Sequence, residues 1–255
     1  MRADVPSRTS GASGASGLSD ASGMSGGSLA RRTDALAAEL LRWCADRGLK
    51  IACAESLTGG LLADAFVRVP GASAVFLGSA VTYDLHAKAK VLGVDAALLA
   101  CEGAVHPQVA RSMAYGAAAL YAQPAYGYGD EVVGLSTTGV AGPGPDGDKP
   151  AGLVYAGFSL PASFAAGASG DMSDGRWSDG GLCGGMLIDG MLFDEGRPAS
   201  VSRPSSATGS REPAPSRLTC AVELRLHGSR EEVRRLTVLR VLQNLSRFTA
   251  RANAL

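Results

Sequence analysis

The stretch that decides the fold is Ala54-Glu55-Ser56-Leu57-Thr58-Gly59-Gly60. An apolar run at 49–54 leads directly into it and predicts a short buried strand, and the residues after the two glycines continue in a helical pattern. We therefore expect Ser56 at a turn where a strand meets the N-terminus of a helix. Such a turn exposes a hydroxyl group and leaves backbone amides unpaired, because the first N–H groups of a helix have no acceptor within it.

Strands and helices alternate on both sides of this stretch. The spacing of apolar residues, with Pro, Gly and capping signals, predicts helices over 33–47, 58–67, 85–92, 95–101 and 107–122, and a last helix opened by the capping box of Ser229 and Glu232. Strands are expected over 49–54, 75–83, 131–137, 152–160 and 217–227, the last two as neighbours. The first two strands are apolar on both faces, which indicates a sheet covered on both sides. The pattern predicts a single three-layer α/β/α domain with a mixed sheet over residues 33–250.

Two segments contain few bulky apolar residues. Residues 1–32 form a Ser/Gly/Ala-rich arm, and residues 161–216 form a Gly/Ser/Pro-rich insertion of low complexity within the domain. Neither buries enough apolar surface to offset the entropy of ordering, so both are predicted to be disordered. The apolar patch at 182–193 leaves open whether part of the insertion folds locally.

The composition argues against several classes of function. The 24 basic and 24 acidic residues balance and aromatic residues make up only 5%, so no nucleic-acid partner is expected. No segment resembles a secretory signal or a membrane span, so we expect a cytoplasmic protein without a membrane partner. The five cysteines form no C-x-x-C pair and the three histidines are scattered. The cysteines are therefore expected to be buried free thiols. With the histidines scattered, we expect neither a metal site nor a cofactor.

Ser56 needs a base to act as a nucleophile, and no histidine lies in a catalytic context. Lys88 follows Tyr83 by five residues, just past a strand end. Partial burial and a nearby helix start would lower the pKa of Lys88 toward that of a usable base. Each residue also has a simpler explanation: Ser56 as a helix cap, Lys88 as a solvated charge, Tyr83 as a strand-end aromatic and the glycines as ordinary turns.

In combination, these segments resemble one family, the C-terminal domain of the competence/damage-inducible protein CinA. The stand-alone members of that family are nicotinamide-nucleotide amidohydrolases, also called NMN deamidases, and this chain resembles that type. The resemblance covers residues 36–160 and resumes over 217–245. It rests on the motifs A-E-S-L-T-G-G (54–60), V-P-G-A-S-A-V-F (69–76), V-T-Y-D-L-H-A-K (81–88), G-A-V-H-P-Q-V-A (103–110), T-G-V-A-G-P-G (138–144) and K-P-A-G-L-V-Y (149–155).

The resemblance implies an amidase of pyridine-nucleotide salvage, which hydrolyses the carboxamide of nicotinamide mononucleotide (NMN) to nicotinate mononucleotide and ammonia without a metal. It implies that Ser56 is the nucleophile, Lys88 its base and Tyr83 a hydrogen-bonding partner of that pair. Arg230, in a Gly-x-Arg context, is implied as a phosphate ligand, for which a guanidinium is well suited. The other substrate-binding residues that it implies are Thr58, Gly59, Gly60, Thr138, Gly139, Ala141 and Gly142.

A second class of function remains open, a non-catalytic nucleotide-binding or competence-associated interaction domain. In such a protein the same glycine loops would hold a ligand while Ser56 never turned over. The presence of Ser56, Tyr83 and Lys88 together favours catalysis on a small-molecule nucleotide. The last helix has a wide apolar face, and with the family resemblance this leads us to expect a homo-oligomer. Its basic residues are expected on a solvated face.

Overall fold

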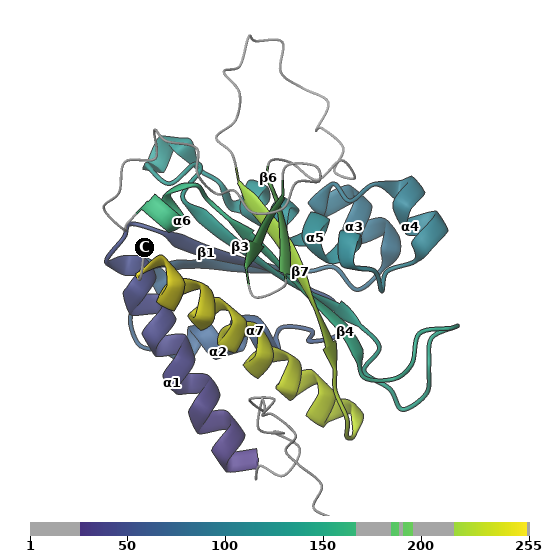
Figure 1. The fold of residues 1–255 in the computed structure, drawn as a ribbon. Helices are drawn as coiled ribbons and strands as arrows, with labels where there is room; N and C mark the ends of the chain where they lie inside the picture. Colours follow the sequence, from purple (N-terminus) through teal and green to yellow (C-terminus); the bar gives the residue numbers. More distant parts are fainter. Residues whose placement is uncertain (1–25, 167–184, 189–190, 196–216, 254–255) are drawn as a thin grey trace, which may run out of the picture.

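The protein is represented by a computed structural model that describes residues 26–166, 185–188, 191–195 and 217–253 (Figure 1). Within them, seven strands form one mixed sheet in the order β2-β1-β3-β4-β7-β6-β5. β1 runs parallel to β2 and β3, whereas β4 and β7 pair antiparallel. The strands are β1 (Lys50–Glu55), β2 (Phe76–Val81), β3 (Val132–Gly139), β4 (Leu153–Leu160), β5 (Gly185–Ile188), β6 (Met191–Glu195) and β7 (Leu218–Arg225).

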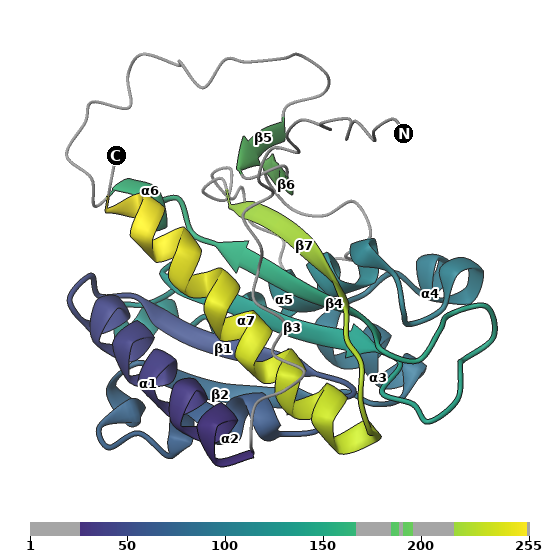
Figure 2. The same ribbon diagram turned by 60° about the horizontal axis from the view of Figure 1, so that its bottom comes forward.

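Helices cover both faces of this sheet, so the predicted three-layer α/β/α architecture is confirmed. Figure 2 shows α1 and α7 in front of the sheet, with α3 and α5 behind it. The front layer holds α1 (Gly26–Ala45), α2 (Leu61–Val67), α6 (Ser163–Ala166) and α7 (Arg230–Ala252), and the back layer holds α3 (Leu85–Leu92), α4 (Ala96–Glu102) and α5 (Pro107–Tyr121). Between the sheet and the front layer, Phe158 of β4 meets Phe248 of α7 edge to face, with ring centroids 5.1 Å apart. The sheet and α7 therefore share one apolar core.

Helix α5 lies with its backbone close against the sheet because two strand positions are glycine. A β-carbon added to Gly134 of β3 would lie 2.0 Å from the carbonyl oxygen of Ala114, and one added to Gly157 of β4 would lie 2.2 Å from that of Ala110. The hydroxyl of Ser136, which pairs with Gly157 across the two strands, donates to the same Ala110 oxygen at 2.6 Å. No larger side chain fits at either glycine without moving the helix.

The N-terminal helix is longer than predicted. Helix α1 begins at Gly26, so the expectation that residues 26–32 belong to a disordered arm is wrong. Leu29 is buried in the core, and the hydroxyl of Thr33 donates to its carbonyl oxygen at 2.9 Å. Burial of this side chain stabilises a turn whose Ser/Gly/Ala composition alone favours disorder. Residues 1–25 of the predicted arm lie outside the described residues.

Part of the predicted disordered insertion has regular structure. Helix α6 and the antiparallel strands β5 and β6 lie within residues 161–216, and β6 pairs with β7 through Asp194 and Thr219. The prediction of disorder is therefore wrong for α6, whereas β5 and most of β6 show the local folding that the sequence left open for residues 182–193. The edge of β7 offers unpaired backbone groups to which another strand can bond. Residues 167–184, 189–190 and 196–216 of the insertion lie outside the described residues.

Two smaller expectations also need correction. Strand β2 is the edge strand of the sheet and is only partly buried, so it is not covered on both faces as expected. Among the cysteines, Cys44, Cys53 and Cys220 are buried free thiols, as predicted, but Cys101 at the end of α4 is exposed. Cys183 lies outside the described residues. Within the described part of the chain, no helix combines the length and the apolar character needed to cross a membrane.

The close packing of α5 yields a stability test. We expect Gly134→Ala to destabilise the fold by about 1–3 kcal/mol or more, because the added methyl group overlaps a helix carbonyl that cannot move alone. Urea unfolding followed by circular dichroism measures this change. Gly144→Ala is the control, since a β-carbon there meets no atom within 4 Å. Equal unfolding midpoints for the two variants would show that α5 moves away from the sheet at little cost.

Candidate active site

Ser56 lies directly after β1 at the carboxyl end of the parallel part of the sheet. Its backbone N–H donates to the carbonyl oxygen of Thr137 at 3.0 Å, which continues the pairing of β1 with β3. Helix α2 begins only at Leu61, with Gly60 as its N-cap. Ser56 therefore does not cap this helix, and the capping explanation is wrong. A short turn, residues 56–60, separates the serine from the helix.

Lys88 is completely buried beside this serine. Its Nζ lies 3.1 Å from Ser56 Oγ and donates to the carbonyl oxygens of Thr82 at 2.6 Å and Tyr83 at 3.2 Å. The residue belongs to α3, whose N-cap Asp84 accepts a hydrogen bond from the backbone of Ala87. The explanation of Lys88 as a solvated helix charge is wrong. The predicted pairing of Ser56 with Lys88 is present in the geometry.

Burial changes the protonation of this lysine. Loss of hydration disfavours the ammonium form and lowers the pKa of Lys88 from 10.5 to about 8, although the nearby carboxylate of Asp84 opposes the shift. A substantial fraction of the side chain is therefore neutral at mildly alkaline pH. The neutral amine has one lone pair and two N–H groups. If those two groups bond to the carbonyls of Thr82 and Tyr83, the lone pair faces Ser56 Oγ.

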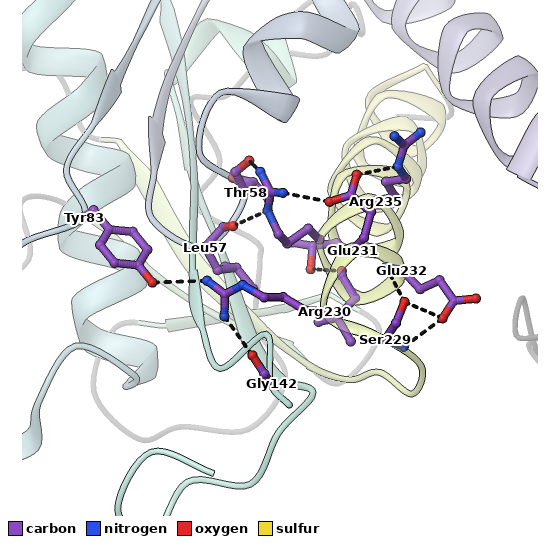
Figure 3. A network of polar contacts seen from close by, with 12 residues as sticks. Leu57, Thr58, Tyr83, Gly142, Ser229, Arg230, Glu231, Glu232 and Arg235 are labelled. Atoms are coloured by element: carbon purple, nitrogen blue, oxygen red, sulfur yellow. Dashed lines mark hydrogen bonds and ion pairs between the residues drawn. The ribbon is translucent and has the colours of Figure 1, made fainter. Parts of the chain in front are cut away.

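Tyr83 touches this pair through its backbone and not through its phenol. Its side chain is 65% exposed, and the phenol oxygen accepts a hydrogen bond from Arg230 Nη2 at 3.3 Å (Figure 3). Nη1 of the same arginine donates to the carbonyl oxygen of Gly142 at 2.8 Å. Arg230 thus joins the start of α7, the end of β2 and the loop after β3, three segments far apart in sequence.

The turn after Ser56 presents two backbone N–H groups without an acceptor among the described residues, those of Leu57 and Thr58. The carbonyl oxygens of the same two residues accept hydrogen bonds from Arg234, at 2.9 Å each. The hydroxyl of Thr58 is 2.7 Å from that of Thr137 on β3. Arg234 was expected on a solvated face of the last helix. It is instead a partly buried contact of the site, and that expectation is wrong.

The loop after β3 divides into two parts. Thr138 is buried and its hydroxyl donates to the carbonyl oxygen of Ala104 at 2.7 Å, and Gly139 pairs with Val154 within the sheet. These two residues belong to the framework. The amides of Ala141 and Gly142 have no acceptor within the described part of the chain. Of the predicted loop residues, the structure therefore brings Gly142 into contact with Arg230 through its carbonyl oxygen, places Ala141 next to it in the chain, and leaves Thr138 and Gly139 in the sheet.

Glu55 is a central residue that the sequence reasoning missed. Its carboxylate is fully buried and accepts hydrogen bonds from the backbone of Gly60, Leu62 and Ala63 and from the hydroxyl of Ser79, at 2.8–3.0 Å. It therefore binds backbone N–H groups at the N-terminus of α2, directly after the predicted turn at Gly59 and Gly60. The available signal was an acidic residue at the end of an apolar strand, next to a helix N-terminus, which attracts negative charge. Among the described residues, no three His, Cys, Asp or Glu side chains gather as a metal site.

The carboxylate of Glu55 can be tested by its isosteric amide. We expect Glu55→Gln to cost about 2 kcal/mol or more in unfolding free energy, because one of its two oxygens becomes a donor facing groups that are themselves donors. Ser79→Ala removes only one of the four bonds and should cost about 1 kcal/mol. Urea unfolding measures both. A Glu55→Gln protein as stable as the wild type would mean that the carboxylate does not hold the turn.

Comparisons with known proteins agree with this architecture. The family model described as the CinA C-terminal domain matches residues 33–174. A CinA-like protein from Frankia casuarinae is 44% identical over 128 residues, which are 50% of this chain and 28% of that protein. A CinA-like protein from Desulfovibrio desulfuricans is 46% identical over 127 residues, 49% of this chain and 27% of that protein. The chain thus spans less than a third of the length of these relatives.

Solved structures show the same fold. The competence/damage inducible protein CihA from Agrobacterium tumefaciens aligns with a TM-score of 0.55 at 25% identity, over 85% of this chain and 95% of that one. A CinA superfamily protein from Klebsiella pneumoniae aligns with a TM-score of 0.58 at 22% identity, over 86% and 98% of the two chains. The second likeness concerns the fold alone. Since the family model matches more than half of its residues, the chain belongs to the CinA C-terminal domain family.

Proposed function

We propose that this protein is an amidohydrolase that converts nicotinamide mononucleotide to nicotinate mononucleotide and ammonia. The observation that carries the proposal is the contact between Ser56 Oγ and the buried Nζ of Lys88. A serine hydroxyl needs a base in order to attack an amide, and an amine with a lowered pKa is such a base. The family resemblance supplies the substrate, and the geometry supports the chemistry.

In the proposed reaction the neutral Lys88 takes the proton of Ser56 while Oγ forms a bond to the carboxamide carbon. The oxyanion that develops would lie against the unpaired N–H groups of Leu57 and Thr58. The tetrahedral intermediate then breaks its C–N bond, and the Lys88 ammonium returns the proton to the nitrogen, which leaves as ammonia. Water attacks the resulting ester with Lys88 again as base. Ser56 is thereby regenerated and nicotinate mononucleotide is released.

The nucleotide part of the substrate carries a phosphate, and the proposed ligands for it gather around Arg230. Its guanidinium and the unpaired amides of Ala141 and Gly142 offer N–H donors suited to phosphate oxygens. The exposed phenol of Tyr83 already bonds to Arg230 and would orient it or the substrate. Gly59 and Gly60 have positive φ angles of 56° and 100°, which glycine adopts readily. They let the chain turn close to Ser56, and neither residue has a side chain that would occupy space there.

The proposal is tested by ammonia release from nicotinamide mononucleotide. We expect Ser56→Ala and Lys88→Met each to lose about 10³-fold or more of the activity, since each removes a member of the nucleophile–base pair. Lys90→Met, at an exposed position of the same helix, is the matched control and should retain activity. A metal chelator should have no effect. If the folded wild type releases no ammonia from this nucleotide, from related nucleotides or from nicotinamide, a nucleotide-binding domain becomes the better reading.

The pH dependence provides a separate test. Because only the neutral amine of Lys88 accepts a proton, kcat/KM should rise with pH through one proton loss and level off above a midpoint of about 8. Below that midpoint the rate should fall about tenfold per pH unit. The substrate phosphate ionises near pH 6, far enough away to be separated. A flat profile between pH 6.5 and 9 would contradict Lys88 as the base.

A further inference from the structure

The guanidinium of Arg234 uses all three of its nitrogens around the turn after Ser56. Nε donates to the carbonyl oxygen of Leu57 and Nη2 to that of Thr58, both at 2.9 Å, and Nη1 pairs with Glu231 at 2.7 Å. The side chain is 26% exposed, so water competes little for these bonds. Arg234 joins α7 to a turn 176 residues away in sequence, and its reach is fixed at both ends.

These carbonyl contacts also determine where the unpaired amides point. A peptide group is planar and trans, so its C=O and the following N–H point in opposite directions. Holding the Leu57 oxygen therefore fixes the direction of the Thr58 N–H. The N–H of Leu57 is fixed in the same way, because the Ser56 oxygen of its peptide group accepts from the backbone of Gly59 at 3.1 Å. The Thr58 oxygen, which accepts from Arg234 and from the backbone N–H of Leu61 at 3.2 Å, in turn fixes that N–H of Gly59.

The positive charge acts in the same sense as the geometry. A guanidinium hydrogen-bonded to a carbonyl oxygen polarises the peptide group and makes its N–H a stronger donor. At position 59, next to the Arg234 guanidinium, the turn carries no side chain. Gly59 has a positive φ of 56°, and a β-carbon there would lie 3.4 Å from Arg234 Nη2.

We propose that Arg234 is a positioning residue, which orients and polarises the amides of Leu57 and Thr58 as the oxyanion site for acyl transfer to Ser56. This inference rests on the proposed amidase function. Arg234 itself touches neither the nucleophile nor the base. Its contribution is realised in the tetrahedral intermediate and hardly at all in substrate binding, so it acts on kcat and not on KM.

The neighbouring arginine provides a matched control. Arg235 pairs with the same Glu231, at 2.7 Å, and is 54% exposed. Among the described residues it forms no hydrogen bond to the turn after Ser56. Arg235→Ala therefore removes another arginine of the same helix, which pairs with the same Glu231. It leaves the hydrogen bonds of Arg234 to the Leu57 and Thr58 carbonyls in place.

The experiment compares Arg234→Ala, Arg234→Lys and Arg235→Ala in two assays: steady-state hydrolysis of nicotinamide mononucleotide, and the burst of p-nitrophenolate released when p-nitrophenyl acetate acylates Ser56. Ser56→Ala identifies the part of the burst that belongs to this serine. We expect Arg234→Ala to lower kcat and the burst rate by about 10–100-fold, somewhat less than the loss of an oxyanion-hole donor itself. KM should stay within about threefold, and the midpoint of the pH profile should not move.

The kcat and burst rate of Arg234→Lys should lie between those of Arg234→Ala and the wild type. An ammonium can donate to one carbonyl but lacks the planar guanidinium that donates to both. Arg235→Ala should stay within about twofold of the wild type. Thermal unfolding identifies any variant that is not folded, and Arg234→Lys then decides in place of Arg234→Ala. Equal kcat values for a folded Arg234 variant and Arg235→Ala, or a loss confined to KM, would overturn the inference.

The two assays separate failure of this inference from failure of the proposed function. If nicotinamide mononucleotide is not hydrolysed but Ser56 is acylated by the ester, the proposed substrate is wrong and the burst rates of the arginine variants judge the inference. If neither substrate acylates Ser56, no oxyanion forms at these amides and the inference is wrong as well.

Discussion

The buried carboxylate of Glu55 is the contact on which the geometry of the site depends. The chain must leave the sheet after β1 and start α2 within a few residues, and this carboxylate accepts four hydrogen bonds across that reversal. A buried charge is tolerated only when its lost hydration is replaced, so each of the four donors is held where it stands. One donor is Ser79 of β2, which ties the edge strand to the same point. Ser56, the next residue, therefore has few alternative positions.

The two sides of the site are held by different parts of the fold. Lys88 comes from α3, 32 residues after Ser56, whereas Arg230 and Arg234 come from the first two turns of α7. These arginines are four residues apart and so share one helix face. Their placement depends on the return of the chain along β7, which pairs with β4 and sets α7 across the sheet. Strands β5 and β6 extend the sheet beyond β7, on the side away from β1, so this part of the insertion does not disturb the reversal after β1.

The elements that depend on local signals were predictable. The capping box of Ser229 and Glu232 opens α7, and Pro107 stands at the first turn of α5 as expected. The start of α1 was not predictable, because it depends on burial of Leu29 in a core formed by distant segments. Arg234 was missed for the same reason, since an arginine on a charged helix looks solvated until the fold supplies two carbonyls for it. The pairing of Ser56 with Lys88 was predicted only through the motifs taken together.

The backbone and the phenol of Tyr83 contact different parts of the site. The carbonyls of Thr82 and Tyr83 lie between β2 and α3. As backbone groups they orient the Lys88 amine independently of the side chain at position 83. The phenol of Tyr83 instead lies at Arg230, at the proposed phosphate end of the substrate. An effect of removing the phenol oxygen would therefore report on Arg230 and the substrate, and not on the protonation of Lys88. The base and the substrate contacts are joined through one residue, but by different atoms of it.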